Sequence, residues 1–108
     1  MNDDQIKFET AKLAEEKGFL FEYIGTVLVN IPTQYELQTW LRKNHNCIVE
    51  VLYNTSEYPN QLKFFSTVNY FGKELQIILT NYDDFNSDSY VKYEDALEIG
   101  LLEALKLI

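Results

Sequence analysis

The chain of 108 residues is predicted to fold as one globular α+β domain, spanning residues 1–108. Apolar side chains recur at helical spacing in three stretches, at the two ends and in the middle. Three consecutive stretches in the second half are rich in β-branched or alternating apolar residues. The resulting order, α-(β)-α-β-β-β-α, predicts a three-stranded antiparallel meander packed with about three helices.

The first helix is predicted from residue 3 or 4 to residue 17. Acidic residues at its start and Lys17 at its end suit the helix dipole. Gly18 fits the position just past the helix, where a left-handed residue ends it, and Phe19 would then fold back on Ala14. The expected apolar side consists of Phe8, Ala11, Leu13 and Ala14.

A second helix is predicted after residues 20–31, an apolar and aromatic stretch that Gly25 interrupts and that suits a short strand or an ordered loop. Thr33 and Glu36 have the spacing of a capping box, which marks a helix start. The stretch Asn44-His45-Asn46 is expected to end the helix, because Asn tolerates left-handed backbone geometry. The side chains expected to point inward are Leu37, Trp40 and Leu41.

Three strands are predicted next, at residues 47–53, 62–70 and 75–79. A polar break at 54–60 separates the first two strands, and a hairpin turn at 70–73 joins the second and third. The residues expected on the inner side of the last two strands are Leu62, Phe64, Val68, Tyr70, Leu75, Ile77 and Leu79.

The last helix is predicted from Tyr93 to Leu107, after a polar loop. Ala96, Gly100 and Ala104 recur every four residues and form a ridge of small side chains. A glycine inside a helix costs about 1 kcal/mol relative to alanine. The ridge therefore predicts a close contact between this helix and the sheet.

The second face of the predicted sheet is unusually apolar, because Phe65, Phe71, Ile78 and Tyr82 alternate with the inward residues. An antiparallel sheet with one wet face is expected to be more polar there. Three explanations stay open: helices cover both faces, the 20–31 segment covers part of the second face, or that face is the contact of a homodimer.

The formal net charge of -8 and the scattered positions of the nine Lys and Arg residues indicate which partners the chain can bind. Nucleic-acid binding normally depends on a basic patch, so we expect no direct contact with nucleic acid. The charge also repels anionic membranes, whereas it would attract a basic partner or let the protein mimic a nucleic acid. Ordinary solubility is a simpler explanation of the same charge.

The number of cysteines and the lengths of the apolar runs indicate the cellular compartment of the protein. A single cysteine excludes an internal disulfide and a multi-cysteine metal site, and a free thiol fits a reducing compartment. No apolar run reaches the length of a membrane span, and the N-terminus lacks the features of a signal peptide. We therefore expect a cytoplasmic protein without a membrane segment.

Three stretches resemble a known group of proteins: residues 10–19 (TAKLAEEKGF), residues 32–45 (PTQYELQTWLRKNH) and residues 93–108 (YEDALEIGLLEALKLI). They resemble short uncharacterised proteins encoded in Bacteroidetes genomes and their phages or mobile elements. Members look like ETAKLAxEKGF, PTQxxLQxWLRxxH and YEEALExGLxEALKLI. The resemblance implies a phage or mobile-element origin, hence a host cytoplasm, and one compact domain. It carries over no catalytic residues.

Catalytic patterns are weak in this chain. His45 could activate the thiol of Cys47, but the two are only two positions apart, where a buried cysteine and a helix-terminal histidine are the simpler explanation. Carboxylate pairs would matter only in a cleft that raises a pKa. No glycine-rich phosphate loop, G-x-S-x-G or H-E-x-x-H occurs. We expect no cofactor and no enzymatic activity, with a small hydrolase as an alternative.

An oxygen-rich loop gives a metal-binding alternative. Asp84, Asn86, Asp88 and Asp95 stand at positions 1, 3, 5 and 12 of a partial calcium loop. Ser89 occupies the position where glycine normally makes the sharp turn. An acidic loop that caps the last helix explains the same residues without a metal.

A binding surface fits the composition best. Eight Tyr and seven Phe stand in the chain, and Tyr is enriched in interfaces because it buries a large rigid ring and keeps a polar tip. Tyr35, Thr39, Arg42 and His45 are expected to line one exposed side of the second helix. The sequence therefore predicts a phage accessory protein that binds another protein; the alternatives are a calcium- or ligand-binding domain using residues 84–95, and an acidic nucleic-acid mimic.

Overall fold

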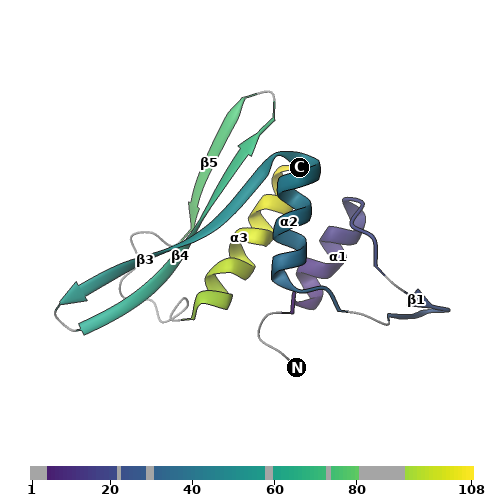
Figure 1. Cartoon of the computed structure of the whole chain (residues 1–108), viewed down its shortest axis with the longest axis horizontal. Helices are drawn as coiled ribbons and strands as arrows, with labels where there is room; N and C mark the ends of the chain where they lie inside the picture. The colour runs from purple at the N-terminus through teal and green to yellow at the C-terminus, as the bar shows by residue number, and fades with distance from the viewer. Residues whose placement is uncertain (1–4, 22, 29–30, 58–59, 73, 81–91) are drawn as a thin grey trace.

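The computed structural model describes residues 5–21, 23–28, 31–57, 60–72, 74–80 and 92–108. In these residues the chain forms three helices and two antiparallel sheets, and Figure 1 shows their arrangement. The elements are α1 (Phe8–Glu16), β1 (Tyr23–Ile24), β2 (Val27–Leu28), α2 (Gln34–His45), β3 (Cys47–Glu57), β4 (Asn60–Phe71), β5 (Leu75–Thr80) and α3 (Tyr93–Leu107). The α+β class and the three-stranded antiparallel meander are confirmed.

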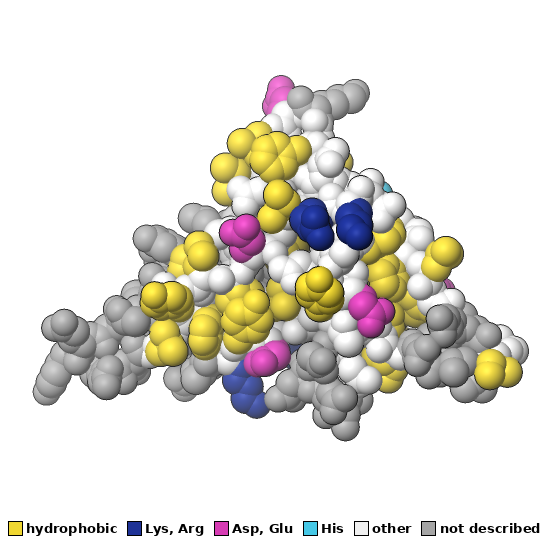
Figure 2. All heavy atoms as spheres, viewed as in Figure 1, with side chains coloured by type: hydrophobic (Ala, Val, Ile, Leu, Met, Phe, Trp, Pro, Cys, Tyr) yellow, Lys and Arg dark blue, Asp and Glu magenta, His cyan; other side chains and the backbone are white. Residues whose placement is uncertain are grey.

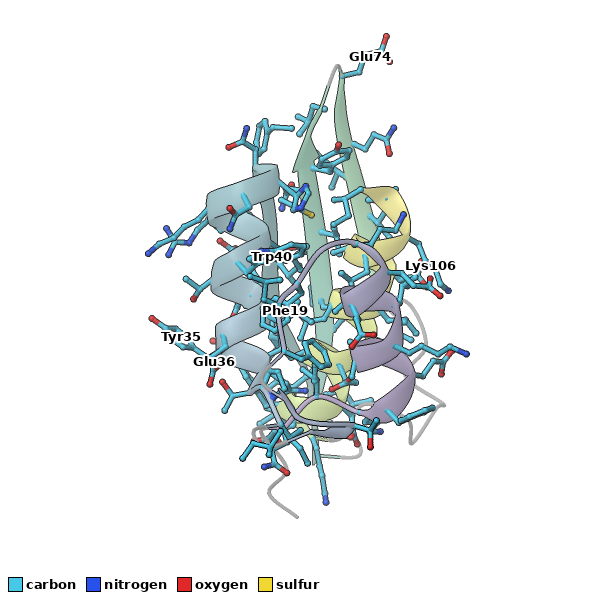
Figure 3. The ribbon with its side chains drawn as sticks, turned by 90° about the vertical axis from the view of Figure 1, so that its right-hand side faces the viewer. Phe19, Tyr35, Glu36, Trp40, Glu74 and Lys106 are labelled. Atoms are coloured by element: carbon cyan, nitrogen blue, oxygen red, sulfur yellow. The ribbon has the colours of Figure 1, made fainter. Side chains whose placement is uncertain are left out.

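The main sheet has the strand order β3-β4-β5, and α3 lies across one of its faces. Viewed at 90° to Figure 1, the three helices stand in front of the sheet, as Figure 3 shows. The molecule is flat, with extents of 53 × 37 × 17 Å. Among the described residues the helices lie on one side of the sheet (Figure 1), where α2 and α3 contact the strands and α1 packs on α3.

The α1 helix begins later than predicted, at Phe8 rather than at residue 3 or 4. Gln5 forms a β-bridge with Thr33, and the Ile6 N–H donates to the Pro32 carbonyl at 3.0 Å. Burial of Ile6 holds this extended entry in place. Phe8, expected on the apolar side, is instead 84% exposed because it stands in the first turn, outside the packed face.

The end of α1 is as predicted. Gly18 has a φ of +103°, a conformation that costs a residue with a Cβ about 1–2 kcal/mol. Its N–H donates to the Glu15 carbonyl, and the Phe19 N–H donates to the Ala14 carbonyl at 3.0 Å. This pair of bonds closes the helix and turns Phe19 into the core.

The 20–31 segment contains the short hairpin β1–β2, in which Gly25 takes a φ of +64°. Figure 1 shows this hairpin at the end of the molecule away from the sheet. Its described residues Leu20 and Ile24 are 90% and 74% exposed. The explanation that this segment covers the second sheet face is therefore wrong for the described residues.

The α2 helix follows the prediction closely. The Thr33 hydroxyl accepts a hydrogen bond from the Glu36 N–H at 3.1 Å, and Asn46 ends the helix in the left-handed region with a φ of 51°. Leu37 and Leu41 are fully buried. Trp40 is half-buried, with its ring 5.3 Å from that of Phe19 in an edge-to-face arrangement.

The strands are longer than predicted, because pairing between β3 and β4 continues to Glu57↔Asn60, inside the expected polar break. Figure 1 shows the far ends of β3 and β4 extending past the helices. Val68 is buried as expected, but Leu62, expected to point inward, is 50% exposed on this extension. The helix layer is too short to cover it.

The orientation predicted for β5 is wrong by one residue. Ile78 pairs with the buried Val68 and packs against the core, whereas Leu75 and Ile77 are 54% and 59% exposed. Both sides of this strand carry apolar residues, so alternation could not identify the inner one. The hairpin register, which places Ile78 opposite Val68, decides it.

The second face of the sheet is partly open. On the central strand, Lys63, Phe65 and Thr67 are buried on this face. Phe71 is 49% exposed on the same face, next to its cross-strand neighbour Leu75. The expectation that helices cover both faces is therefore not met among the described residues.

The α3 helix spans the predicted Tyr93–Leu107, and its small-residue ridge faces the sheet. Ala96, Gly100 and Ala104 are fully buried or nearly so. The side chains that form the core around them are Ile6, Ala14, Phe19, Leu37, Leu41, Cys47, Val49, Val68, Leu97, Leu101 and Leu105.

Candidate functional site

A groove runs between α2 and the first strand of the main sheet. It has a volume of about 230 Å³ and is lined by Tyr35, Gln38, Thr39, Arg42, Ile48, Val49 and Glu50. One wall is the outer side of α2, and the other is the edge strand β3. The tertiary fold thus brings a helix face and a strand edge together, although they come from separate parts of the chain.

The groove floor is fixed by a hydrogen bond between its two walls. The Gln38 side-chain amide donates to the Val49 carbonyl at 2.5 Å. Val49 and Val68 form a non-hydrogen-bonded pair, so this carbonyl points away from β4. Because β3 is an edge strand, the carbonyl has no other strand to pair with among the described residues. Gln38 therefore ties α2 to the strand edge at the groove.

Arg42 supplies the positive charge of the groove. Its side chain is exposed, and no described residue forms an ion pair or hydrogen bond with its guanidinium. Lys43 is exposed beside it. Figure 2 shows two basic side chains next to each other over the region of α2, with exposed apolar side chains on either side. This is a local basic spot on a chain of net charge -8.

Tyr35 supplies an aromatic surface at the other end of the helix wall. Its side chain is 72% exposed. Figure 3 shows Tyr35 pointing away from the body of the protein, whereas Phe19 and Trp40 point into the space between α2 and α1. An exposed tyrosine ring offers a partner a rigid apolar surface and a hydroxyl group.

The predicted binding residues divide into two groups. The structure brings Tyr35 and Arg42 into the groove, together with Thr39. His45 is not part of it: this side chain is half-buried, with its ring 4.7 Å from that of Trp40. The Trp40 ring lies on the inner side of the helix end, and the His45 imidazole packs against it.

Sequence patterns did not identify the residues of the strand wall. Ile48 and Glu50 enter the groove because β3 turns back along α2 immediately after Asn46. The Gln38–Val49 hydrogen bond joins residues eleven positions apart, so no local period could predict it. The left-handed Asn46, which sets the return of the chain, was the available signal.

Cys47 lies at the start of β3, with its side chain fully buried in the core. Burial raises the pKa of this thiol from 9.0 to about 11, because the apolar surroundings disfavour the thiolate. A thiol of this kind is a poor nucleophile at neutral pH. The proposed pairing with His45 is not favoured, since the imidazole packs on Trp40.

A second hollow lies between the start of α1 and α3. It has a volume of about 300 Å³ and is lined by Lys7, Glu9, Thr10, Asp95, Glu98, Ile99 and Leu102. The carboxylate of Glu98 is buried, and it accepts hydrogen bonds from the Gln34 amide at 3.0 Å and from the Lys7 N–H at 3.1 Å. Glu98 thus joins α1, α2 and α3, and its hydrogen bonds account for its burial.

The predicted calcium loop lies largely outside the described residues, which include neither Asp84, Asn86 nor Asp88. Asp95 is in the first turn of α3, where its side chain borders the second hollow. Within the described ranges no group of three or more His, Cys, Asp and Glu side chains could hold a metal ion.

Neither models of protein families, nor curated proteins, nor solved structures match this chain. The resemblance to Bacteroidetes and phage proteins therefore stays a prediction. Over the described ranges, no helix combines the length and apolar character that a membrane crossing needs.

Proposed function

We propose that this protein acts without catalysis, by binding another protein at the groove between α2 and β3. The observation that carries the proposal is the exposure of Tyr35 and Arg42 on one wall of a groove that Gln38 fixes in place. Tyrosine and arginine are the residue types that most often dominate the energy of protein interfaces.

Each residue has a separate role in this proposal. The guanidinium of Arg42 binds a carboxylate of the partner, through two parallel hydrogen bonds. Tyr35 receives an apolar side chain on its ring. Glu50, exposed on the strand wall, faces a basic group of the partner. The partner thus presents an acidic, an apolar and a basic side chain close together.

The size of the groove favours a protein partner over a small molecule. A volume of about 230 Å³ is below the roughly 300–1,000 Å³ typical of ligand pockets. The charge of -8 also disfavours nucleic acid and steers basic protein surfaces toward the molecule. The resemblance to phage and mobile-element proteins supports a host protein as the partner, met in the host cytoplasm.

The test is affinity capture from a Bacteroidetes lysate, with matched variants. Arg42→Glu and Tyr35→Ala alter the groove. Lys12→Glu and Phe8→Ala make the same changes at exposed sites on α1, since Phe8 is 84% exposed. We expect one protein to be enriched by the wild type and both controls, and to fall about tenfold or more with either groove variant.

Two results would contradict the proposal. The first is that no captured protein distinguishes the groove variants from the controls. The second is that the captured protein is a nucleic-acid-binding protein that competing DNA releases, and that it binds all four variants with equal affinity. This result would support the acidic mimic instead.

A further inference from the structure

We infer that β5 pairs in antiparallel fashion with β5 of a second copy of this chain, so that two three-stranded sheets join into one sheet of six strands. This inference concerns the edge of the sheet opposite the groove. It does not depend on the proposed function, and it moves the expected homodimer contact from the open second face to the strand that borders that face.

Within the part of the chain that the structure describes, no strand pairs with the outer side of β5, so the backbone groups on that side have no partner in the sheet. The Phe71 N–H donates to the Asn46 carbonyl, so the odd-numbered residues of β4 point toward β3 and the even-numbered ones toward β5. Val68 and Tyr70 therefore exchange hydrogen bonds with Ile78 and Gln76. The N–H and C=O groups of residues 75, 77 and 79 then point away from the sheet.

Among the described residues, the β5 edge lacks the features that prevent strand pairing. Its sequence, Leu-Gln-Ile-Ile-Leu-Thr, contains no charged residue and no proline. Leu75 and Ile77 are 54% and 59% exposed. Exposed apolar edge strands invite pairing, and proteins usually protect them with charges, prolines or a covering element. The opposite edge has such cover, because Gln38 of α2 occupies the Val49 carbonyl.

The strand suits a second copy of itself. With Ile77 opposite Ile77 of the partner copy, residues 75 to 79 overlap and all the outward-pointing groups of 75, 77 and 79 are paired. Two molecules of charge -8 repel each other, so they need an uncharged contact. This strand provides one, and identical strands place no like charges opposite each other.

The same arrangement extends the open apolar face. Leu75 and Ile77 project on the side of Phe71, so pairing places these side chains from both copies next to each other. A contact of two short strands buries less than the roughly 800 Å² per partner of a standard interface. We therefore expect a reversible dimer with a dissociation constant on the order of tens of micromolar.

Sedimentation equilibrium over about a hundredfold range of concentration tests the dimer. We expect the wild type to pass from monomer to dimer in this range. Ile77→Lys places two like charges opposite each other and should remain monomeric. Leu20→Lys, at a site 90% exposed outside the sheet, should dimerise as the wild type does. A wild type that stays monomeric throughout overturns the inference.

Disulfide trapping tests the register, and it does not depend on the lysine variant. Cα atoms of a hydrogen-bonded pair lie about 5.5 Å apart, within disulfide range, whereas sheets stacked face to face lie about 10 Å apart. In air, Ile77→Cys should form a covalent dimer, and Gln76→Cys, opposite Ile78, should not. Cross-linking of Phe71→Cys in place of Ile77→Cys would overturn the edge pairing, since it indicates face-to-face stacking.

Discussion

Gly100 on α3 lies against Ser66 on β4 so closely that a Cβ on the glycine would stand 2.6 Å from the Ser66 hydroxyl oxygen. The same Cβ would lie 2.9 Å from Cγ1 of Val49 on β3. Ordinary contacts of this kind are longer than 3.4 Å. The helix therefore approaches two strands at a distance that only glycine permits, and this contact positions the helix layer on the sheet.

Replacement of this glycine is expected to destabilise the fold. Gly100→Ala gains about 1 kcal/mol of helix propensity but forces α3 away from Ser66 and Val49, at a cost of about 2–3 kcal/mol. We expect the free energy of unfolding, measured with urea, to fall by about 1–2 kcal/mol. An increase in stability would show that the helix moves away without loss of packing.

The buried Glu98 gives a second prediction. Gln34→Ala removes the amide that donates to its carboxylate at 3.0 Å, and an unpaired buried acceptor costs about 1–3 kcal/mol. Gln34→Glu keeps the shape but places two carboxylates together, so it should cost more at pH 7. Acidification should narrow the difference between the two variants. Equal unfolding curves for both variants at every pH would contradict this account.

The raised pKa of the Cys47 thiol predicts that the folded protein loses stability at high pH. Its pKa rises from 9.0 in the unfolded chain to about 11 in the folded protein, so between these values the unfolded state releases a proton that the folded state retains. The contribution of this thiol to the free energy of unfolding is fully present below pH 9. It decreases toward pH 11, by about 2–3 kcal/mol in all. The measurement is the free energy of unfolding of the wild type relative to Cys47→Ala, which removes the common titration of Tyr and Lys. A constant difference would refute the prediction.

His45 is expected to act in stability and not in binding. Its ring packs edge-on against Trp40, with centroids 4.7 Å apart, and such pairs contribute about 0.5–1.5 kcal/mol. We expect His45→Ala to lower the free energy of unfolding by that amount and to change Trp40 fluorescence. In the affinity capture it should retain the partner that Arg42→Glu loses. Loss of the partner with both variants would return His45 to the binding site.

The calcium alternative can be decided by titration. We expect no heat of binding and no shift of the melting temperature at millimolar calcium, because Ser89 replaces the usual glycine and a strand, not a helix, precedes the loop. Asp84→Asn serves as the control. A melting shift that Asp84→Asn abolishes would establish the metal site instead.

Local signals in the sequence were sufficient for much of the fold. The capping box of Thr33 and Glu36 places the start of α2, and the left-handed Gly18 and Asn46 end α1 and α2 where the sequence predicted. The small-residue ridge around Gly100 predicted a close helix–sheet contact. Each signal is a property of a few neighbouring residues, so it needs no knowledge of the rest of the chain.

The candidate site was predictable only in part. Tyr35 and Arg42 share the outer side of one helix, and helical spacing alone places them together. The same spacing also placed His45 on this side, but its ring packs edge-on against Trp40, a contact that depends on how the helix end packs. The strand wall, with Ile48 and Glu50, depends on the path of the chain after Asn46.

The sequence by itself determined the order of the elements, the ends of the second and third helices and the α+β class, because capping, periodicity and glycine placement are local. The tertiary structure decided which face of β5 is inward, since both faces are apolar and only the pairing of Ile78 with Val68 distinguishes them. It also decided that α1 starts at Phe8, because the burial of Ile6 and the bridge to Thr33 outweigh the acidic start. Contacts between distant residues, which carry no local pattern, made both decisions.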